Sequence, residues 1–459
     1  MLADIRKIAS LAWPVLIGQL AVIAFGLIDT VMAGRYSAVD LAALGLGSSI
    51  FVSVYVGLTG VVLALQPIAA QLFGARRYAE IGEEVRQTLW LAAALSVLGV
   101  LAMVFPGPLL ALAHVPQALY ERTELYLRIA AVGLPASLVF RVYSALANAV
   151  GKPRLVMVLQ IGALIVKIGL NDWFIFGGAG VPPLGGPGCA LASTVINFAL
   201  AGIALTALAR LDIFEPFGIF ERFCLPNRQR LAALLKLGLP MGLSYLIEVT
   251  SYAFMALFIA RFGTTTLAGH QITGNFGAVL YMTPMSIGIA TSTLVAHALG
   301  AEGHQTARAL ARHGIQMACA IGCCYAAISF ALRPAILAGY TTDGAVIAAA
   351  MPLMPIMLVY HIFDTFQTAV AFILRAYKIA VIPTVIYAVA LWGVGLGGGY
   401  LLGFDVGGIA PPWLTGARGF WTASAASLAA AGAGLFLYWR HVSRRYASAA
   451  SPISPTRSA

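Results

Sequence analysis

Long apolar segments dominate the hydrophobic pattern of the chain, and charged residues collect in the short connections between them. Each segment has about 20 residues or more, enough for a helix to cross about 30 Å of hydrocarbon, and short alternating strands typical of a β-barrel are absent from the sequence. The pattern therefore predicts an all-α polytopic membrane protein with twelve transmembrane helices, at approximately 9–33, 41–69, 88–112, 128–149, 154–176, 188–209, 236–260, 267–296, 314–334, 346–374, 379–402 and 415–438.

Several of these segments are longer than a straight span requires, which permits tilted or kinked helices. Proline lacks a backbone N–H and disrupts a helix interior, so we expect break points at Pro14, Pro67, Pro240 and Pro284. The first segment is too long for the apolar region of a signal peptide and is followed by no small-residue cleavage site, so we expect it to remain in the protein.

Composition agrees with a bilayer environment. Of the 459 residues, 60% are hydrophobic and 10% are charged, and the mean hydropathy is +0.90. The sequence contains no Walker A loop, nucleophile elbow or HExxH motif, so neither ATP-driven transport nor a familiar membrane hydrolase has a supporting motif.

Lysine and arginine are distributed unevenly between the two sides of the predicted topology. With the amino terminus inside, the inner segments hold 20 of the 28 basic residues and the outer connections hold six, while Arg141 and Lys167 lie within helices. This asymmetry predicts a multi-pass protein of a bacterial-type cytoplasmic (inner) membrane with both termini cytoplasmic. The net charge of +11 therefore reflects membrane topology, and we expect no nucleic-acid partner.

The second half of the chain repeats the first at an offset of 226 residues. LAWP at 11–14 aligns with LGLP at 237–240, Gly74-Ala75 with Gly300-Ala301, and Arg86 with Arg312. The repeat predicts two six-helix bundles: an N-lobe at 1–209, a cytoplasmic linker at 210–235, a C-lobe at 236–440 and a cytoplasmic tail at 441–459. Because each half has an even number of spans, the repeats are parallel, and parallel repeats enclose a central cavity that can open alternately to each side.

Two acids interrupt long uncharged stretches of the second half. Glu248 is the only charged residue between Lys236 and Arg261, and Asp364 is the only one between Asp343 and Arg375. Helical spacing aligns each acid with other polar groups, Ser244, Ser251 and Tyr252 for Glu248 and Tyr360, Gln367 and Thr368 for Asp364. Buried charge is costly in a membrane, so these faces are expected to line a polar cavity.

A structural explanation of these acids is a packing ion pair with a buried base, or a hydrated position near a bent helix end. No lysine or arginine is evident in the middle of the second-half spans, so the carboxylate, phenol and amide groups are candidates to hold protons or a hard cation. We therefore predict a cation-coupling site at Glu248, Asp364 and Tyr360, where the two acids are candidates to bind Na+.

The first half has a different set of charges. Asp29 is the only charged residue between Lys7 and Arg35, and Lys167 and Asn171 are one helical turn apart. These residues predict a pocket for protonation or substrate binding, in which a Lys167–Asp29 pair opens on protonation or on arrival of a cationic ligand. Alternatively, Asp29 is an ordinary interfacial acid and Lys167 snorkels. Arg141 is expected to brace the half by pairing with carbonyls or an acid.

Long phrases of the sequence resemble the multidrug and toxic compound extrusion (MATE) family, in its NorM-like branch. They are PVLIGQLAVIAFGLIDTVMAG, LNDWFIFG, LGLPMGLSYLIEVTSYAFMALFIARFGTTTLAGHQI and FDTFQTAVAFILRAYK. The resemblance extends over essentially the whole chain. It implies a secondary active transporter rather than an enzyme, which carries out multidrug efflux by antiport. Amphipathic, often cationic compounds are then exported in exchange for Na+ or H+, and no cofactor is expected apart from this coupling ion.

The resemblance also assigns roles residue by residue. Glu248 and Asp364 match acids implicated in cation coupling, with Tyr360 beside them, and Asp29 matches the first-lobe acid linked to protonation. Asn171 matches an asparagine of that lobe's pocket. The chain departs from the family where many relatives have a second asparagine, since it has Lys167 there, and it lacks the acid that follows the helix-four arginine in many relatives.

Two other classes of protein fit parts of the pattern. A flippase for lipid-linked precursors has the same fold superfamily, but we would expect a strongly cationic cavity for pyrophosphate head groups. A polytopic membrane enzyme needs acids or histidines clustered at one membrane interface, whereas His270 and His361 are isolated within helices. The expected partners are amphipathic, cationic small-molecule substrates and membrane lipid, and we expect a monomeric state.

Overall fold

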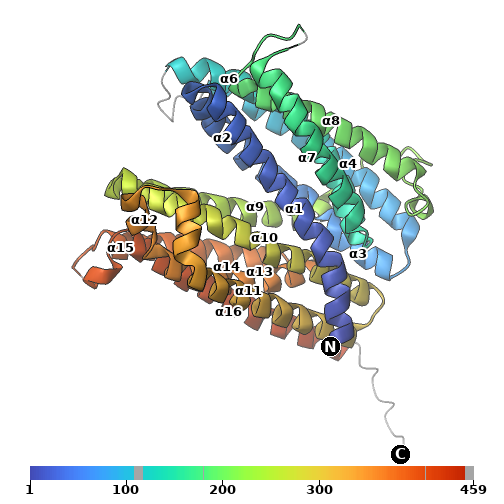
Figure 1. The fold of residues 1–459 in the computed structure, drawn as a ribbon. Helices are drawn as coiled ribbons and strands as arrows, with labels where there is room; N and C mark the ends of the chain where they lie inside the picture. Colours follow the sequence, from blue (N-terminus) through green and yellow to red (C-terminus); the bar gives the residue numbers. More distant parts are fainter. Residues whose placement is uncertain (108–116, 179, 409, 450–459) are drawn as a thin grey trace, which may run out of the picture. The chain divides into compact units, whose positions relative to one another are not determined.

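The computed structural model describes residues 1–107, 117–178, 180–408 and 410–449 (Figure 1). Within these residues, twelve helical segments are long and apolar enough to cross a membrane, which confirms the predicted all-α, twelve-span architecture. The end of the predicted span at 88–112 and the tail beyond 449 lie outside the described residues. The helices are α1 (Leu2–Tyr36), α2 (Ala38–Val62), α3 (Leu65–Gly74), α4 (Tyr78–Val104), α6 (Gln117–Ala149), α7 (Pro153–Phe176), α8 (Gly186–Arg210), α9 (Arg228–Ile259), α10 (Thr264–Gly300), α11 (His304–Tyr340), α12 (Gly344–Ala350), α13 (Leu353–Ala376), α14 (Val381–Tyr387), α15 (Gly398–Gly403) and α16 (Ala417–Ala449).

Only some of the prolines coincide with helix breaks. The break between α2 and α3 falls just before Pro67, as expected, whereas Pro14, Pro240 and Pro284 lie inside helices that continue on both sides. The predicted span at 346–374 is divided into α12 and α13, because Pro352 follows the end of α12 and cannot donate a helical hydrogen bond.

The chain divides into two compact units by its internal contacts. One comprises Trp13–Phe73 and Arg77–Leu246, and the other comprises Met1–Ala12, Gly74–Arg76 and Ile247–Ala459. We refer to them as the first and second units. The chain passes from one unit to the other inside α1, after Ala12, and inside α9, after Leu246.

In the first unit, α6 is the central helix and contacts α2, α4, α7 and α8 (Figure 1). Small residues allow the beginning of α9 to approach α2 very closely. A Cβ atom added to Gly60 would lie 2.4 Å from the Cα of Gly242, and one added to Gly242 would lie 2.6 Å from the carbonyl oxygen of Gly57. Backbone contact of this kind is a usual means of helix association in membranes.

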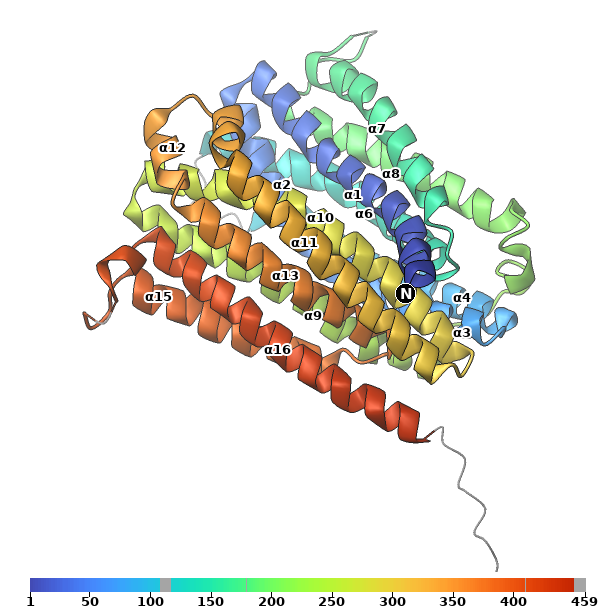
Figure 2. The same ribbon diagram turned by 60° about the horizontal axis from the view of Figure 1, so that its bottom comes forward.

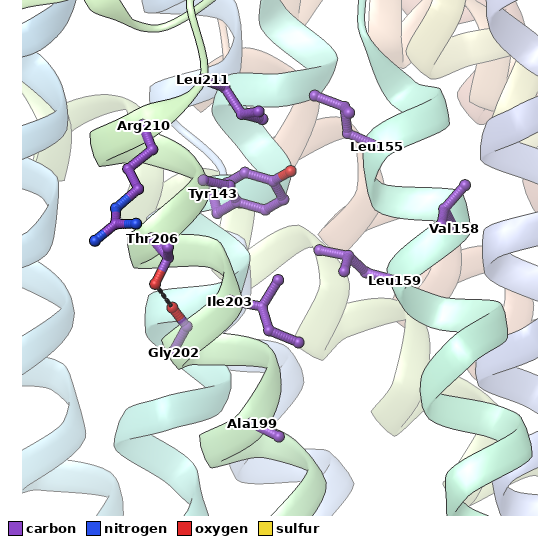
Figure 3. Close-up of a pocket in the computed structure, with 11 residues that line it drawn as sticks. Tyr143, Leu155, Val158, Leu159, Ala199, Gly202, Ile203, Thr206, Arg210 and Leu211 are labelled. Atoms are coloured by element: carbon purple, nitrogen blue, oxygen red, sulfur yellow. Dashed lines mark hydrogen bonds between the residues drawn. The ribbon is translucent and has the colours of Figure 1, made fainter.

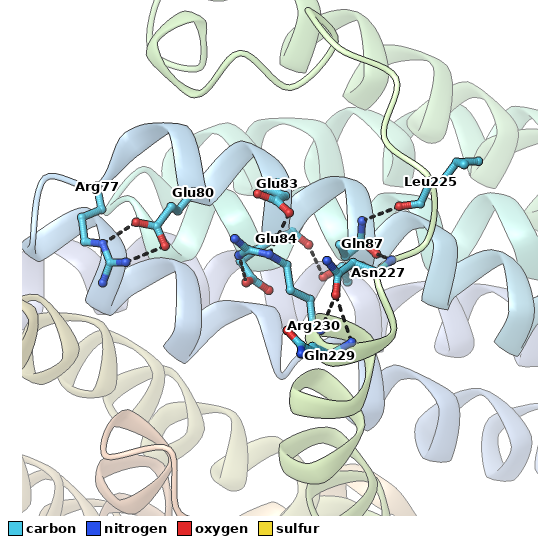
Figure 4. A network of polar contacts seen from close by, with 10 residues as sticks. Arg77, Glu80, Glu83, Glu84, Gln87, Leu225, Asn227, Gln229 and Arg230 are labelled. Atoms are coloured by element: carbon cyan, nitrogen blue, oxygen red, sulfur yellow. Dashed lines mark hydrogen bonds and ion pairs between the residues drawn. The ribbon is translucent and has the colours of Figure 1, made fainter.

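A polar network fixes the connection between α8 and α9 to α4 in the first unit (Figure 4). The Gln87 side chain donates to the carbonyl of Leu225 at 3.1 Å and accepts from the backbone N–H of Asn227 at 2.7 Å. One turn earlier, Glu84 pairs with Arg230 at 2.6 Å. The connection is thereby attached to α4 before α9 begins.

In the second unit, α13 packs against α10, α11 and α16, which run beside it in Figure 2. The apolar core of this bundle includes the fully buried Met354 and Met357 together with Phe420 and Trp421. Farther along the unit, the π-helical segment Ala388–Gly397 joins α14 to α15. Such segments are rare and often occur at functional sites.

The backbone preserves the repeat at a tight turn in each half. Arg76, between α3 and α4, has a φ of 58°, and Glu302, between α10 and α11, has a φ of 59°. These residues are 226 positions apart, the same offset found in the sequence. Neither is glycine, so the left-handed conformation is maintained at some steric cost in both halves.

Candidate functional site

The structure brings Asp29 and Lys167 together in the first unit. Asp29 lies on α1 and Lys167 on α7, and the Lys167 Nζ atom is 3.0 Å from a carboxylate oxygen of Asp29. The side chains are 13% and 3% exposed. A buried lysine requires a counter-charge or polar partners, and here a carboxylate from another helix supplies the charge.

Three further groups complete this first polar cluster. Asn171, one turn beyond Lys167, donates from Nδ2 to the other carboxylate oxygen of Asp29 at 2.7 Å. The Lys167 ammonium donates to Ser193 Oγ on α8 and lies 5.4 Å from the ring centre of Phe25. The Asn171 side-chain oxygen is buried without a hydrogen-bond partner among the described residues. The cluster can therefore accept one more donor without losing a bond.

Arg141, on α6, differs from the expectation that it pairs with carbonyls or an acid. It donates from Nε to the hydroxyl of Tyr55 at 2.7 Å, and its guanidinium carbon lies 5.6 Å from the same ring centre. Tyr55 is on α2, so Arg141 connects two helices of the first unit. This contact is consistent with a bracing role.

The second cluster contains Glu248 of α9 and Asp364 of α13, both in the second unit. The two carboxyl groups are close enough to interact electrostatically, and Tyr360 interacts with both of them. Asp364 is 8% exposed and accepts a hydrogen bond from Gln367 Nε2 at 2.9 Å. The acids from two separate sequence phrases thus share one polar region inside the membrane spans.

Gln367 is the centre of a short hydrogen-bond chain. Its Nε2 group also lies 3.1 Å from Thr368 Oγ1, and its Oε1 atom accepts from the hydroxyl of Tyr387 on α14. Because Tyr387 engages the amide oxygen, the amide nitrogen faces the carboxylate of Asp364. Tyr387 is 2% exposed and was not among the predicted site residues.

Arg375 is a second residue that sequence reasoning did not include. It lies in the last turn of α13, where a basic residue would ordinarily reach water, but it is 9% exposed and interacts electrostatically with Glu248. No base in the middle of a second-half span was expected, and Arg375 acts on Glu248 from the end of α13 instead. The sequence signal was present, since Arg375 follows Asp364 on the same helix by 11 residues.

The two remaining predicted residues of α9 have different surroundings. Tyr252 stacks on His270 of α10, with ring centres 5.1 Å apart, and interacts electrostatically with Tyr360. Its hydroxyl occupies the space that a Cβ atom of Gly274 would need. Ser244 belongs to the first unit and donates to the carbonyl of Pro240 on its own helix at 3.0 Å. The structure therefore joins Tyr252 to the second cluster and gives Ser244 a contact within α9.

The side-chain groups of the second cluster suit a proton or a hard monovalent cation, because they are carboxylate, phenol, hydroxyl and amide groups. In the part of the chain that the structure describes, no group of three or more histidine, cysteine, aspartate or glutamate residues could hold a metal ion. A Na+ ion at Glu248 and Asp364 would need oxygen from neighbours, whereas Gln367 presents its nitrogen to Asp364.

Comparison with known proteins agrees with these features. The MatE family model matches residues 14–173 and 240–401, two segments that begin 226 residues apart. The chain is 38% identical over 413 residues to a probable multidrug resistance protein NorM of Aromatoleum aromaticum, covering 90% of this chain and 89% of the relative. It is 36% identical to the multidrug resistance protein PmpM of Pseudomonas aeruginosa, covering 97% and 93%.

Solved structures with little sequence similarity have the same fold. The eukaryotic MATE transporter AtDTX14 superimposes with a TM-score of 0.85 at 18% identity, covering 98% of this chain and 99% of that one. A MOP superfamily transporter from Pyrococcus furiosus gives 0.87 at 17% identity, covering 97% of each chain. The protein is thus a multi-pass membrane transporter and not an enzyme. The chain belongs to the MatE family, as its sequence phrases indicated.

Proposed function

We propose that the protein exports amphipathic, often cationic compounds in exchange for Na+ or H+. The observation that carries this proposal is the pairing of Glu248 and Asp364, two carboxyl groups from different helices that are near each other inside membrane spans. Curated relatives at 30–38% identity are named multidrug resistance proteins, which supports the same kind of substrate for this chain.

The second cluster is proposed as the coupling site. Two adjacent carboxylates in a low-dielectric region repel each other, so a proton or a Na+ ion that neutralises one charge stabilises the pair. Glu248 and Asp364 would hold the ion, and Tyr360 would line the site. An ion that binds one conformation better than the other shifts the equilibrium between them, which is the requirement for coupled exchange.

The first cluster is proposed as a pocket for protonation or substrate. Lys167 already neutralises Asp29 as a tethered cation, so protonation of Asp29 or approach of a cationic solute would compete with the lysine for the carboxylate. Asn171 would hold the remaining carboxylate oxygen during this exchange. The pocket can thus respond to a cation without carrying a net negative charge at rest.

The same proposal includes the location of the protein. The excess of lysine and arginine in alternate connections favours an inner membrane with both chain termini in the cytoplasm. Cysteine accessibility at positions introduced near Met1 and in the connection between α1 and α2 would test this orientation.

Efflux from proteoliposomes tests transport and ion choice together. Purified protein is reconstituted with a fluorescent cationic compound, such as ethidium, and either a Na+ gradient or a pH gradient is applied. Gradient-driven movement under one of the two conditions is expected, and it should be lost in the Glu248→Gln/Asp364→Asn variant. Movement of ethidium that depends on neither gradient would overturn the antiport proposal.

A further inference from the structure

An apolar cavity of about 720 Å³ lies between α7 and α8 in the first unit, closer to the start of α7 and the end of α8 than the first polar cluster on the same helices (Figure 3). Its volume is in the range of small-molecule sites. Two of its residues, Val158 and Ile203, are 61% and 50% exposed and belong to membrane-spanning helices, so they are available to lipid acyl chains. The lining is apolar apart from Tyr143, Thr206 and Arg210, and Gly202 forms part of one wall.

One polar group faces this groove without a partner. Tyr143 of α6 is 1% exposed and packs against Phe140 and Phe214, with ring centres 6.0 Å away in each case. Figure 3 shows its hydroxyl directed toward α7, and the hydroxyl has no hydrogen-bond partner among the described residues. A ligand that places an acceptor in the groove would give this hydroxyl a hydrogen bond.

A cationic residue lies at the end of the groove. Arg210 is the last residue of α8, is exposed, and forms no ion pair within the described part of the chain. In Figure 3 its guanidinium extends along the outside of α8, and an exposed side chain reaches the mouth of the groove by an ordinary change of rotamer. Asp212 follows closely, but Lys152 and Arg154 begin α7 at the same end, so positive charge predominates there.

We propose that this groove binds one acyl chain of an anionic phospholipid from the leaflet on the side of the amino terminus. The apolar walls accept the chain, the Tyr143 hydroxyl donates to an ester carbonyl of the glycerol backbone, and Arg210 contacts the phosphate. Basic residues at the membrane end of a pocket between helices are a usual site for anionic head groups. The site is distinct from both polar clusters and does not depend on the direction of transport.

The test compares phosphatidylglycerol with phosphatidylcholine of the same acyl chains. Native mass spectrometry of the delipidated protein, titrated with each lipid, counts bound molecules. The wild-type protein is expected to retain one phosphatidylglycerol with about fivefold preference over phosphatidylcholine, the gain that one basic residue near a membrane surface provides.

Two variants distinguish the contribution of the acyl chain to lipid binding from the contribution of the head group. Gly202 lines the groove, and a Cβ atom there meets no heavy atom within 4 Å, so Gly202→Leu should occupy part of the groove and reduce binding of both lipids. Arg210→Gln should remove the preference and leave phosphatidylcholine binding unchanged. The matched controls are Gly339→Leu, which also enters open space, and Arg222→Gln, an exposed arginine outside the groove, and both should bind lipid like the wild type.

Three results would overturn the proposal. They are equal binding of the two lipids by the wild-type protein, unchanged phosphatidylglycerol binding by Gly202→Leu, and one-for-one displacement of the bound lipid by ethidium, which would mark the groove as a substrate route. Should Gly202→Leu not fold, the loss of preference in Arg210→Gln alone decides the assignment.

Discussion

The ammonium of Lys167 lies 3.0 Å from the carboxylate of Asp29, and both groups are inside membrane spans. The cation that faces the acid is therefore a side chain of α7 itself. The pair is buried, so its two charges depend on each other far more than an exposed pair would.

Removal of one partner should therefore destabilise the protein more than removal of both. Lys167→Met leaves Asp29 without its counter-charge and is expected to lower the free energy of unfolding by about 3 kcal/mol, while the Lys167→Met/Asp29→Asn double variant should remain within about 1 kcal/mol of the wild type. Thermal unfolding of the purified variants in detergent measures the difference. Additive effects of the two substitutions would show that the pair is not coupled.

The pH dependence of export gives an independent test of the same pair. In Lys167→Ala the carboxyl group of Asp29 has no adjacent cation, so it should keep its proton to higher pH and release it less readily. The alkaline limb of the export profile is then expected to move upward by about one pH unit or more, the usual effect of losing an opposite charge at this distance. Asp29→Asn should stop proton-driven export. Superimposable profiles of Lys167→Ala and wild type would instead favour a snorkelling lysine.

The overall fold could be predicted from the sequence because the bilayer imposes a simple rule on span length and on backbone hydrogen bonds. The acids could be found for the same reason, since Glu248 and Asp364 interrupt long uncharged stretches. Helical periodicity also aligned Tyr360 and Gln367 with Asp364, and the structure joins Gln367 to Asp364 by a hydrogen bond.

Contacts between distant helices could not be predicted in this way. Tyr387 reaches Gln367 from another helix, and no spacing rule relates two residues on separate spans. The π-helical segment that follows Tyr387 was expected to be an ordinary helix, because composition does not distinguish the two forms in an apolar span. In the sequence Arg375 only marks the end of an uncharged stretch, because its burial depends on the neighbouring helices.

Neutral replacements of the second-cluster acids should separate coupling from folding. Glu248→Gln and Asp364→Asn keep the size and hydrogen-bonding capacity of each side chain but cannot bind a cation by charge, so gradient-driven export should fall to background in each. Expression and membrane insertion should be nearly unchanged, because each substitution removes a buried charge. Ethidium efflux from proteoliposomes measures export, with the exposed Glu302→Gln as the matched control. Wild-type efflux in both variants would exclude the acids from coupling, and loss of folded protein would favour a structural ion pair with Arg375.

The bond between Tyr387 and Gln367 should influence which ion drives export. While Tyr387 donates to the amide oxygen, Gln367 presents a nitrogen donor to Asp364, an arrangement that suits a proton on the carboxyl cluster better than Na+, which needs oxygen ligands. Tyr387→Phe frees the amide to rotate and offer its oxygen. The ratio of Na+-driven to pH-driven export is therefore expected to rise, whichever gradient the wild type prefers.

Paired efflux measurements under the two gradients give this ratio directly and cancel differences in the amount of reconstituted protein. Tyr400→Phe is the matched control, because it removes a phenol hydroxyl from the same region of the chain at a position that is 40% exposed. A merely structural role for Tyr387 would reduce both modes of export equally. A constant ratio in Tyr387→Phe would accordingly show that the orientation of Gln367 does not select the ion.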